Sequence, residues 1–269
     1  MITVAAKSKP YVGVCGVSSV EEAKDVVQLI RSSGFTLQTD HIPMMGFQVS
    51  WKSMDFGFSE GNRRVPHLNQ LPLILKEVKG EVFSTLHYYT KRPEQLVHEL
   101  GRLMEHDGIY VNGLVDGVQL NRVFPRPYEI KVLKDIYPEL KIILQVYPDP
   151  DSTKQLAKNL AREYGQLDYI ILDYSHGKGV ELDTAQISLS YRTIRDSGFG
   201  AGVVFAGGLT GDNIKAKVAQ LSEAVGSYDF SIDAEGGLRD KVGEGYGNDV
   251  LNLGKVASFL RGASEAFQG

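Results

Sequence analysis

Short apolar segments of strand length alternate with longer amphipathic segments along this chain, and this alternation limits its possible folds more than any other feature. Eight segments rich in β-branched and aromatic residues predict strands. Several of them are apolar throughout, as strands buried on both faces of a parallel sheet are. The predicted strands span residues 11–15, 44–49, 81–89, 116–120, 141–147, 167–174, 201–206 and 228–232.

Helix signals fill the intervals between the predicted strands. In residues 19–34, apolar side chains recur at helical spacing from Ala23 to Ile30, and Gly34 ends the pattern. Comparable segments span residues 93–108, 151–165, 183–198 and 210–226. Dividing 269 residues among eight repeats gives about 34 residues each, and one βαβ unit needs ~30 or more. The pattern therefore predicts an α/β fold, a single (β/α)8 TIM barrel over residues 1–269, in preference to an open doubly wound sheet.

Two longer irregular stretches, residues 35–43 and 50–72, lie on either side of the second predicted strand. We interpret them as connections at the ends of the barrel and not as a second domain. The second strand is therefore expected to be followed by an enlarged loop.

The charge balance and the single cysteine exclude several classes of protein. Against 33 Asp and Glu residues stand 29 Lys and Arg residues, for a net charge of −4, which argues against a nucleic-acid-binding surface. Cys15 is the only cysteine, so an intrachain disulfide and a multi-cysteine metal site are excluded. No apolar run approaches the ~18 residues of a membrane helix, and the first residues form no secretory signal. We expect a cytoplasmic protein with a small-molecule partner and no nucleic-acid or membrane partner, either monomeric or homodimeric.

Barrel enzymes carry their active sites at the carboxyl ends of the strands, in the loops that follow them. Here that position selects Cys15, Lys52, Arg63, Arg64, His87, Asn121, Arg122, Asp173, the pair Gly207-Gly208 and residues 231–237. The segment FAGGLTGDNI (205–214) passes from a predicted strand through the glycine pair to a helix start. Such a turn can hold a phosphate on its backbone N–H groups, although it is also an ordinary strand-to-helix connection. The scattered histidines form no pair at metal-ligand spacing, so we expect no metal.

Five segments, in order along nearly the whole chain, resemble the phosphoribosylanthranilate isomerase family. VGVCGVSSVEEA (12–23) resembles its first strand and turn, and DGVQLNRV (116–123) its fourth strand. LDYIILDYSHGKGVELD (167–183) resembles the sixth strand and loop, and VVFAGGLTGDNI (203–214) the seventh. YDFSIDAEGGLRD (228–240) is similar to the eighth. The resemblance implies a barrel of the ribulose-phosphate-binding type.

The resemblance also implies a reaction, an Amadori rearrangement of a phosphorylated aminosugar that carries anthranilate, in tryptophan biosynthesis. Asp173 matches the family's general acid, which opens the sugar ring, and Cys15 matches its general base, which takes the C2 proton. Arg64, or Arg63 beside it, matches the arginine that faces the anthranilate carboxylate. Gly207, Gly208 and the segment that contains Ser231 and Asp233 match the phosphate site. No cofactor is implied.

Three departures from the family pattern put its usual substrate in doubt. Asn121 stands where the family has a histidine, Asp233 stands where a glycine meets the phosphate, and the loop after the second strand is long. A carboxylate beside a phosphate is repulsive, so Asp233 predicts weak phosphate affinity if it points into that site. The alternative is a diverged barrel that binds or converts another small phosphorylated or carboxylated metabolite, with Lys52 and Lys178 as candidates for a Schiff base. A non-catalytic barrel, with Cys15 as a buried apolar side chain, is disfavoured because Cys15 and Asp173 are both present.

Overall fold

Eight parallel strands close into a barrel in which each strand pairs with its neighbours in sequence and β8 pairs with β1. The computed structural model describes residues 8–147, 152–173 and 184–268. This architecture confirms the predicted (β/α)8 barrel. The strands are β1 (Tyr11–Cys15), β2 (Ile42–Ser50), β3 (Phe83–Tyr89), β4 (Gly117–Asn121), β5 (Lys141–Val146), β6 (Tyr169–Asp173), β7 (Gly202–Ala206) and β8 (Ser231–Ala234).

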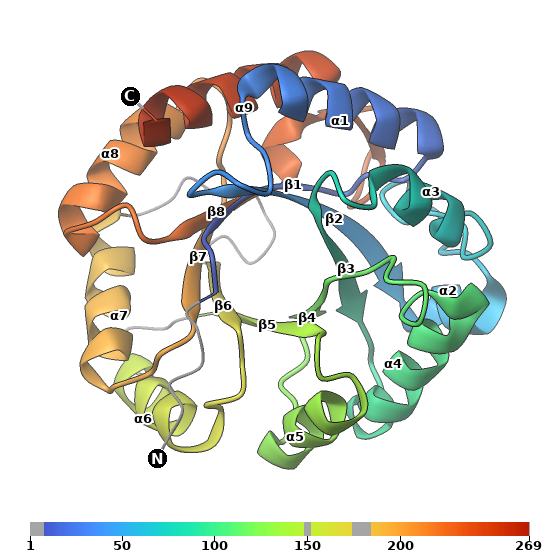
Figure 1. Ribbon diagram of the computed structural model, residues 1–269, viewed down its shortest axis with the longest axis horizontal. Helices are drawn as coiled ribbons and strands as arrows, with labels where there is room; N and C mark the ends of the chain where they lie inside the picture. Colours follow the sequence, from blue (N-terminus) through green and yellow to red (C-terminus); the bar gives the residue numbers. More distant parts are fainter. Residues whose placement is uncertain (1–7, 148–151, 174–183, 269) are drawn as a thin grey trace.

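Helices surround the strands as an outer ring (Figure 1). None of the helices in the described residues is long and apolar enough to cross a membrane. The α-helices are α1 (Val20–Ser33), α2 (Trp51–Phe56), α3 (Leu71–Val78), α4 (Leu96–Glu105), α5 (Pro127–Ile136), α6 (Thr153–Glu163), α7 (Thr184–Asp196), α8 (Ile214–Val225) and α9 (Leu253–Gln268). Short 3₁₀ turns are η1 (Pro93–Gln95), η2 (His106–Gly108) and η3 (Gly236–Leu238).

Local sequence explains where the best-predicted helix begins and ends. The Ser19 side chain accepts a hydrogen bond from the backbone N–H of Glu22, which caps the start of α1. Gly34 ends the helix with φ 84°, in the left-handed region that glycine adopts without strain. Between the two caps, the apolar residues that the sequence pattern picked out are buried against the strands.

Two apolar regions make up the core. The larger one fills the space between the strands and the helices, and the smaller one lies inside the barrel. Tyr11, Phe83 and Tyr169 are the first residues of their strands, and their rings pack at centroid distances of 5.3–6.0 Å. These rings fill the amino-terminal end of the barrel, so polar side chains inside it gather toward the carboxyl end.

Two features at the carboxyl end differ from the sequence expectation. The predicted eighth strand, 228–232, begins instead at Ser231 and ends at Ala234, because Phe230 packs against Phe205 and Phe267 and precedes the ladder. After β8 the chain forms an antiparallel hairpin, β9 (Arg239–Lys241) with β10 (Asp249–Leu251), which the sequence patterns did not indicate.

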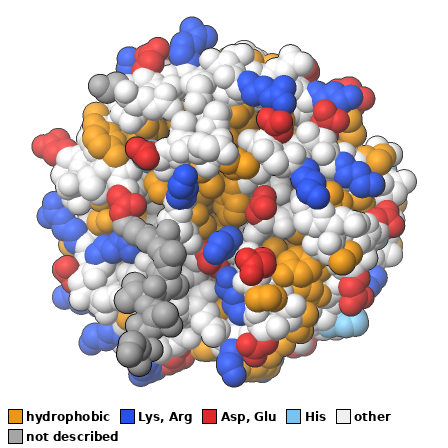
Figure 2. Space-filling view, in the orientation of Figure 1, with side chains coloured by type: hydrophobic (Ala, Val, Ile, Leu, Met, Phe, Trp, Pro, Cys, Tyr) orange, Lys and Arg blue, Asp and Glu red, His pale blue; other side chains and the backbone are white. Residues whose placement is uncertain are grey.

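The enlarged loop after β2 is present, and it contains α2 directly after the strand. Ser50 caps this short helix and Gly57 ends it with φ 80°. Lys and Arg side chains are interspersed with Asp and Glu side chains over the face in Figure 2. That distribution matches the nearly balanced net charge of −4.

Candidate active site

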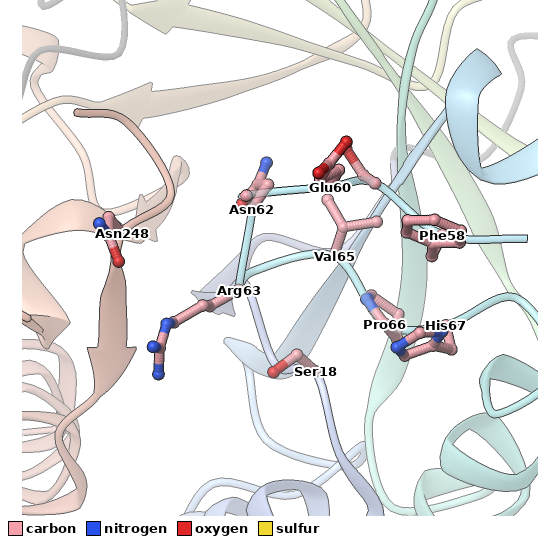
Figure 3. A pocket seen from close by; sticks show the side chains of 11 residues that line it. Ser18, Phe58, Glu60, Asn62, Arg63, Val65, Pro66, His67 and Asn248 are labelled. Atoms are coloured by element: carbon pink, nitrogen blue, oxygen red, sulfur yellow. The ribbon is translucent and has the colours of Figure 1, made fainter. Parts of the chain in front are cut away.

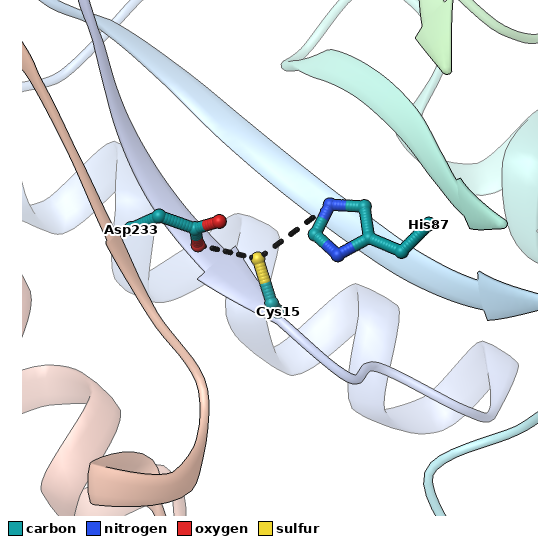
Figure 4. A group of neighbouring side chains, drawn as sticks. All are labelled: Cys15, His87 and Asp233. Carbon is teal, nitrogen blue, oxygen red and sulfur yellow. Dashed lines mark hydrogen bonds between the residues drawn. The ribbon is translucent and has the colours of Figure 1, made fainter. Parts of the chain in front are cut away.

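Cys15 lies at the end of β1 with its side chain inside the barrel, between Asp233 of β8 and His87 of β3 (Figure 4). The Sγ thiol donates a hydrogen bond of 2.6 Å to Oδ1 of Asp233 and lies 3.9 Å from Nε2 of His87. All three side chains are buried. We call Cys15, His87 and Asp233 the thiol cluster.

Two glycines make room for the thiol cluster. A Cβ atom at Gly13 would lie 2.8 Å from Oδ1 of Asp233, and one at Gly46 would lie 2.7 Å from Sγ of Cys15 and 2.5 Å from the His87 ring. Contacts this short do not occur between non-bonded carbon, sulfur and oxygen atoms in a relaxed core. Glycine at both positions is therefore required for the three side chains to meet.

Burial sets the protonation state of the thiol cluster. It raises the pKa of the Cys15 thiol well above its usual value, and the charge of Asp233 raises it further. Burial also raises the pKa of Asp233 to about 7, partly offset by the Cys15 hydrogen bond, and lowers the pKa of His87 to about 3. At neutral pH the thiol is a protonated donor, His87 is uncharged, and Asp233 is the group that titrates.

Asp173 ends β6 at the same end of the barrel and is buried. Its Oδ2 accepts a hydrogen bond of 2.8 Å from Nε2 of Gln145. The charge of Asp173 contributes to the raised pKa of Asp233, so Asp173 acts on Asp233 across the interior. The structure therefore brings the predicted acid, Asp173, and the predicted base, Cys15, to one end of the barrel.

Arg64 is not an open anion-binding group, contrary to the sequence expectation. Its Nε and one terminal nitrogen donate to the two carboxylate oxygens of Asp249 at 2.9 and 2.5 Å, and its other nitrogen donates to Glu235 at 2.5 Å. Arg239 donates to the same Asp249 at 2.7 Å. These four buried or half-buried residues, the arginine network, connect the loop after β2 to the β9–β10 hairpin, so the charge of Arg64 is already neutralised by protein carboxylates.

Arg63 is exposed and lines a cavity of about 590 Å³ between the loop after β2 and the hairpin (Figure 3). Ser18 and Asn248 close the cavity from the β1 and hairpin sides. Neither Cys15 nor Asp173 lines it. The arginine pair expected at one substrate carboxylate is therefore divided between a structural network and a separate surface cavity.

Ser231 does not reach the predicted phosphate site. It is the first residue of β8, it pairs with Val204 in the middle of β7, and its hydroxyl accepts a 2.9 Å hydrogen bond from the Tyr11 backbone N–H. The later position of the strand explains this, because the predicted strand, 228–232, would have placed Ser231 near the carboxyl end, whereas Ser231 is the first residue of β8. Asp233 also differs from expectation, since its carboxyl group points to Cys15 inside the barrel.

The glycine pair of the predicted phosphate site lies directly after β7. Gly207 and Gly208 follow β7 with φ 116° and 61°. The turn after β8 packs closely on Leu209, the residue that follows this pair, since a Cβ atom at Gly237 would lie 2.1 Å from the Leu209 carbonyl oxygen. Asn121, at the end of β4, accepts a 2.6 Å hydrogen bond from Gln119 and borders the same end of the barrel.

By ligand type, the thiol cluster could also hold a metal ion. One donor atom from each of its three residues lies within 4.8 Å of the other two, and Cys, His and Asp are all zinc ligands. No local spacing pattern marks this group, because Cys15 is 72 positions from His87 and 218 from Asp233. Of the two Schiff-base candidates, Lys52 is exposed on α2 and Lys178 lies outside the described residues.

No family model and no curated protein matches the chain. Solved structures do match it over almost its full length. Phosphoribosyl anthranilate isomerase from Thermus thermophilus is 16% identical with a TM-score of 0.61, covering 95% of this chain and 98% of its own. The enzyme from Thermotoga maritima is 17% identical with a TM-score of 0.61, covering 95% and 99%.

A phosphoribosyl anthranilate isomerase in complex with reduced 1-(o-carboxyphenylamino)-1-deoxyribulose 5-phosphate is 18% identical with a TM-score of 0.59, covering 95% and 99%. At sequence identities of 16–18%, the similarity extends to the fold alone. This protein therefore shares with the phosphoribosyl anthranilate isomerases the closed (β/α)8 barrel fold.

Proposed function

We propose that this protein is an acid–base isomerase that converts a phosphorylated aminosugar from the aldose to the ketose form, as the name of its structural neighbours implies for them. The observation that carries the proposal is that Cys15 and Asp173 each end a strand at the same end of one barrel and are both buried there. Two groups on rigid strands can serve the opposed proton transfers that such a reaction needs.

In the proposed first step, Asp173 donates a proton to the ring oxygen of the sugar, the C1–O bond breaks, and the amine nitrogen forms an iminium with C1. In the second step, the C2 proton leaves to the enzyme and its bonding electrons form a C1–C2 double bond, which gives an enolamine. Tautomerisation of the enolamine gives the ketone at C2. No oxidant or reductant is needed, since the electrons stay within the substrate.

The thiol cluster suits the proton-accepting role in the second step. A thiol that is protonated at neutral pH accepts a proton only if it first gives up its own, and the Asp233 carboxylate is 2.6 Å away to take it. The raised pKa of Asp233, about 7, matches the operating pH of a general base. Asp233 thus supports the role of Cys15 as a proton acceptor. The family resemblance did not assign this role to Asp233.

The glycine turns after β7 and β8 support the phosphate part of the proposal. Gly207 and Gly208 have positive φ values and can turn backbone N–H groups toward an anion. With Asp233 directed to Cys15, the carboxylate that was expected to oppose a phosphate is engaged elsewhere.

One observation favours the second candidate, a diverged barrel that acts on another small phosphorylated or carboxylated metabolite. Arg64, which the resemblance assigns to the anthranilate carboxylate, is held by Asp249 and Glu235. The proton-transfer groups are compatible with either candidate, so the difference between them lies in how the substrate is recognised.

Consumption of phosphoribosylanthranilate, followed by fluorescence, tests the proposal. We expect turnover by the native protein, and losses of ~10²–10⁴ in kcat for Asp173→Asn and for Cys15→Ala. Asp135→Asn, on the exposed face of α5, is the matched control and should retain full activity. Absence of turnover with the native protein, or unchanged activity in both site variants, would reject the proposal, and a stoichiometric zinc content would reassign the thiol cluster to a metal.

A further inference from the structure

Gln48 lies inside the barrel, directly above the thiol cluster. It pairs with His87 in the ladder between β2 and β3. It also follows Gly46 by two residues, so the two positions face the same side of the strand. A Cβ atom at Gly46 would meet Sγ of Cys15 in the interior. The buried side chain of Gln48 therefore also faces the interior, one layer closer to the carboxyl end than the thiol.

The amide of Gln48 spans the end of β1. Its Nε2 donates a 2.6 Å hydrogen bond to Oε1 of Glu235, which follows β8. Because β1 lies between β2 and β8 in the barrel, this bond crosses the carboxyl end of β1, where Cys15 is the last residue. Gly16, the next residue, lies against it, since a Cβ atom there would be 3.6 Å from Oε1 of Glu235. Gln48 and Glu235 thus cover the side of the barrel mouth where the thiol cluster lies.

Tyr246 reaches this pair from the turn of the β9–β10 hairpin. Its hydroxyl oxygen accepts a 3.2 Å hydrogen bond from the same Nε2 of Gln48. The guanidinium carbon of Arg64 lies 4.4 Å from the centroid of its ring. Although 59% of Tyr246 is exposed, its oxygen is therefore bonded to a buried amide. Tyr246 extends the cover of the thiol cluster from the barrel interior to the solvent.

The turn that carries Tyr246 is fixed on one side and open on the other. Gly247 has φ 80°, and a Cβ atom there would lie 2.4 Å from Oδ1 of Asn62. Gly245 has φ 87°, and no atom of the described residues lies within 4 Å of its added Cβ. Glycine adopts these conformations without strain and leaves the backbone free to rotate. Tyr246 can therefore swing away from the amide while the strands of the hairpin stay in place.

We propose that Tyr246 is a specificity-determining residue, which limits the size of the molecules that reach Cys15. While its hydroxyl holds the Gln48 amide, the thiol cluster is closed on this side, and only 1% of Cys15 is exposed. One neutral hydrogen bond and a cation–π contact with Arg64 hold the ring, and both are weak enough to break when a small molecule enters. The ring then borders the entry and restricts the bulk of the group that passes. This role of Tyr246 deepens the proposed function and rests on it for the substrate, whereas access to Cys15 can be measured without turnover.

The hairpin does not depend on Tyr246 for its position. Its strands pair with each other from Arg239 to Lys241. Arg64 and Arg239 both bind Asp249, which joins the hairpin to the loop after β2. Replacement of Tyr246 leaves these supports in place, so a change in access to Cys15 can be assigned to the tyrosine itself.

Modification of Cys15 by two thiol reagents of different size measures this access, because Cys15 is the only cysteine of the chain. Methyl methanethiosulfonate is small and benzyl methanethiosulfonate is bulky. In each, the thiolate attacks the sulfur that carries the methyl or benzyl group, a disulfide forms, and methanesulfinate leaves. Since both reagents need the same thiolate, a change in the pKa of the thiol alters both rates alike. The ratio of the bulky to the small rate, each divided by the rate for free cysteine, therefore reports access, and mass spectrometry of the intact protein gives both rates.

We expect a ratio well below one for the native protein. Tyr246→Ala should raise the ratio about fivefold or more, the factor that one neutral hydrogen bond represents. Tyr246→Phe keeps the ring but loses the bond to Gln48, so its ratio should lie between the two. Tyr128→Ala is the matched control and should give the native ratio, since Tyr128 is 54% exposed and the guanidinium carbon of Arg126 lies 4.9 Å from its ring centroid.

Three results would overturn this role of Tyr246: a native ratio near one, equal ratios for Tyr246→Ala and the native protein, or an equal rise in Tyr128→Ala. Turnover separates the role from the proposed function. If the native protein converts phosphoribosylanthranilate and the ratio does not depend on Tyr246, the function stands and the role of Tyr246 fails. If the native protein does not convert it and the ratio rises in Tyr246→Ala alone, Tyr246 controls access to Cys15 and the isomerase proposal fails.

Discussion

Two clusters of buried polar side chains lie at the carboxyl end of the barrel, and they shift the pKa of their aspartates in opposite directions. In the arginine network, Arg64 and Arg239 hold the pKa of Asp249 far below its usual value, against the effect of burial. In the thiol cluster, Asp233 has a thiol and a neutral histidine beside it, and its pKa rises to about 7.

The contrast shows how partners decide what a buried carboxyl group can do. A carboxylate paired with two guanidinium groups keeps its charge and fixes two loops to each other. A carboxyl group that lacks a cationic partner changes its charge near neutral pH, which makes it suitable for moving protons. We therefore assign the arginine network to structure and the thiol cluster to chemistry.

The largest expected effect is on stability, at the arginine network. Asp249→Asn removes the carboxylate that pairs with both Arg64 and Arg239, and it leaves the two guanidinium groups buried. Breaking a buried ion pair lowers the free energy of unfolding by ~3–5 kcal/mol. Chemical denaturation measures the free energy of unfolding. Asp233→Asn should cost far less at pH 8, because it removes a carboxylate that has no cationic partner in the described residues. Equal losses in the two variants would show that the clusters do not differ in the way described.

The second effect is the pH dependence of stability, which should have opposite signs at the two aspartates. The pKa of Asp233 in the folded protein is raised to about 7. Its contribution to the free energy of unfolding is therefore fully present below the unfolded-state pKa of ~3.9 and is lost as the pH rises to about 7. The slope is at most ~1.4 kcal/mol per pH unit. The depressed pKa of Asp249 gives stability that is present above ~3.9 and is lost at lower pH.

Unfolding of the native protein, Asp233→Asn and Asp249→Asn across pH 3–9 checks these signs. Asp233→Asn should gain stability relative to the native protein as the pH rises from about 4 to 7, with no further change above that. Glu235 and Asp173 also act on Asp233, so both remain in place in the comparison. A difference between Asp233→Asn and the native protein that does not vary with pH would contradict the raised pKa.

The smallest expected effect comes from the glycines that allow the thiol cluster to form. Gly46→Ala would place a methyl group 2.5 Å from the His87 ring and 2.7 Å from Sγ of Cys15. Forcing atoms into a packed core costs ~1–3 kcal/mol, and the displaced thiol should slow turnover as well. Gly165→Ala is the control, since nothing lies within 4 Å of its added Cβ. Equal unfolding free energies for Gly46→Ala and the native protein would show that Gly46 does not limit the packing.

The fold was predictable because its signal is local and repeated. Each strand is a short apolar run, and α1 carries both of its caps within 16 residues, from Ser19 to Gly34. The positions of Cys15 and Asp173 followed, because both end strands that the apolar runs define well. Helices α3 and α5 were not singled out, since each has a proline in its first two positions, in a context that resembles a loop.

The partners in the site were not predictable, because they depend on register and on distant contacts. The apolar run at residues 228–232 predicted the eighth strand too early in the chain, so Ser231 was expected at the wrong end of that strand. Arg64 meets Glu235 and Asp249 from 171 and 185 positions away, and no local pattern records such a pair. The role of Asp233 beside Cys15 likewise required the closure of β8 onto β1.

The pH profile of kcat/KM for phosphoribosylanthranilate is the most direct test of the central claim, that Cys15 passes its proton to Asp233 opposite the acid Asp173. We predict that kcat/KM rises with pH through an apparent pKa near 7, as the Asp233 carboxyl group ionises. In Asp233→Asn that rise should disappear and the rate should fall ~10²-fold or more. An unchanged profile and rate in Asp233→Asn, or no conversion by the native protein at any pH, would contradict the account.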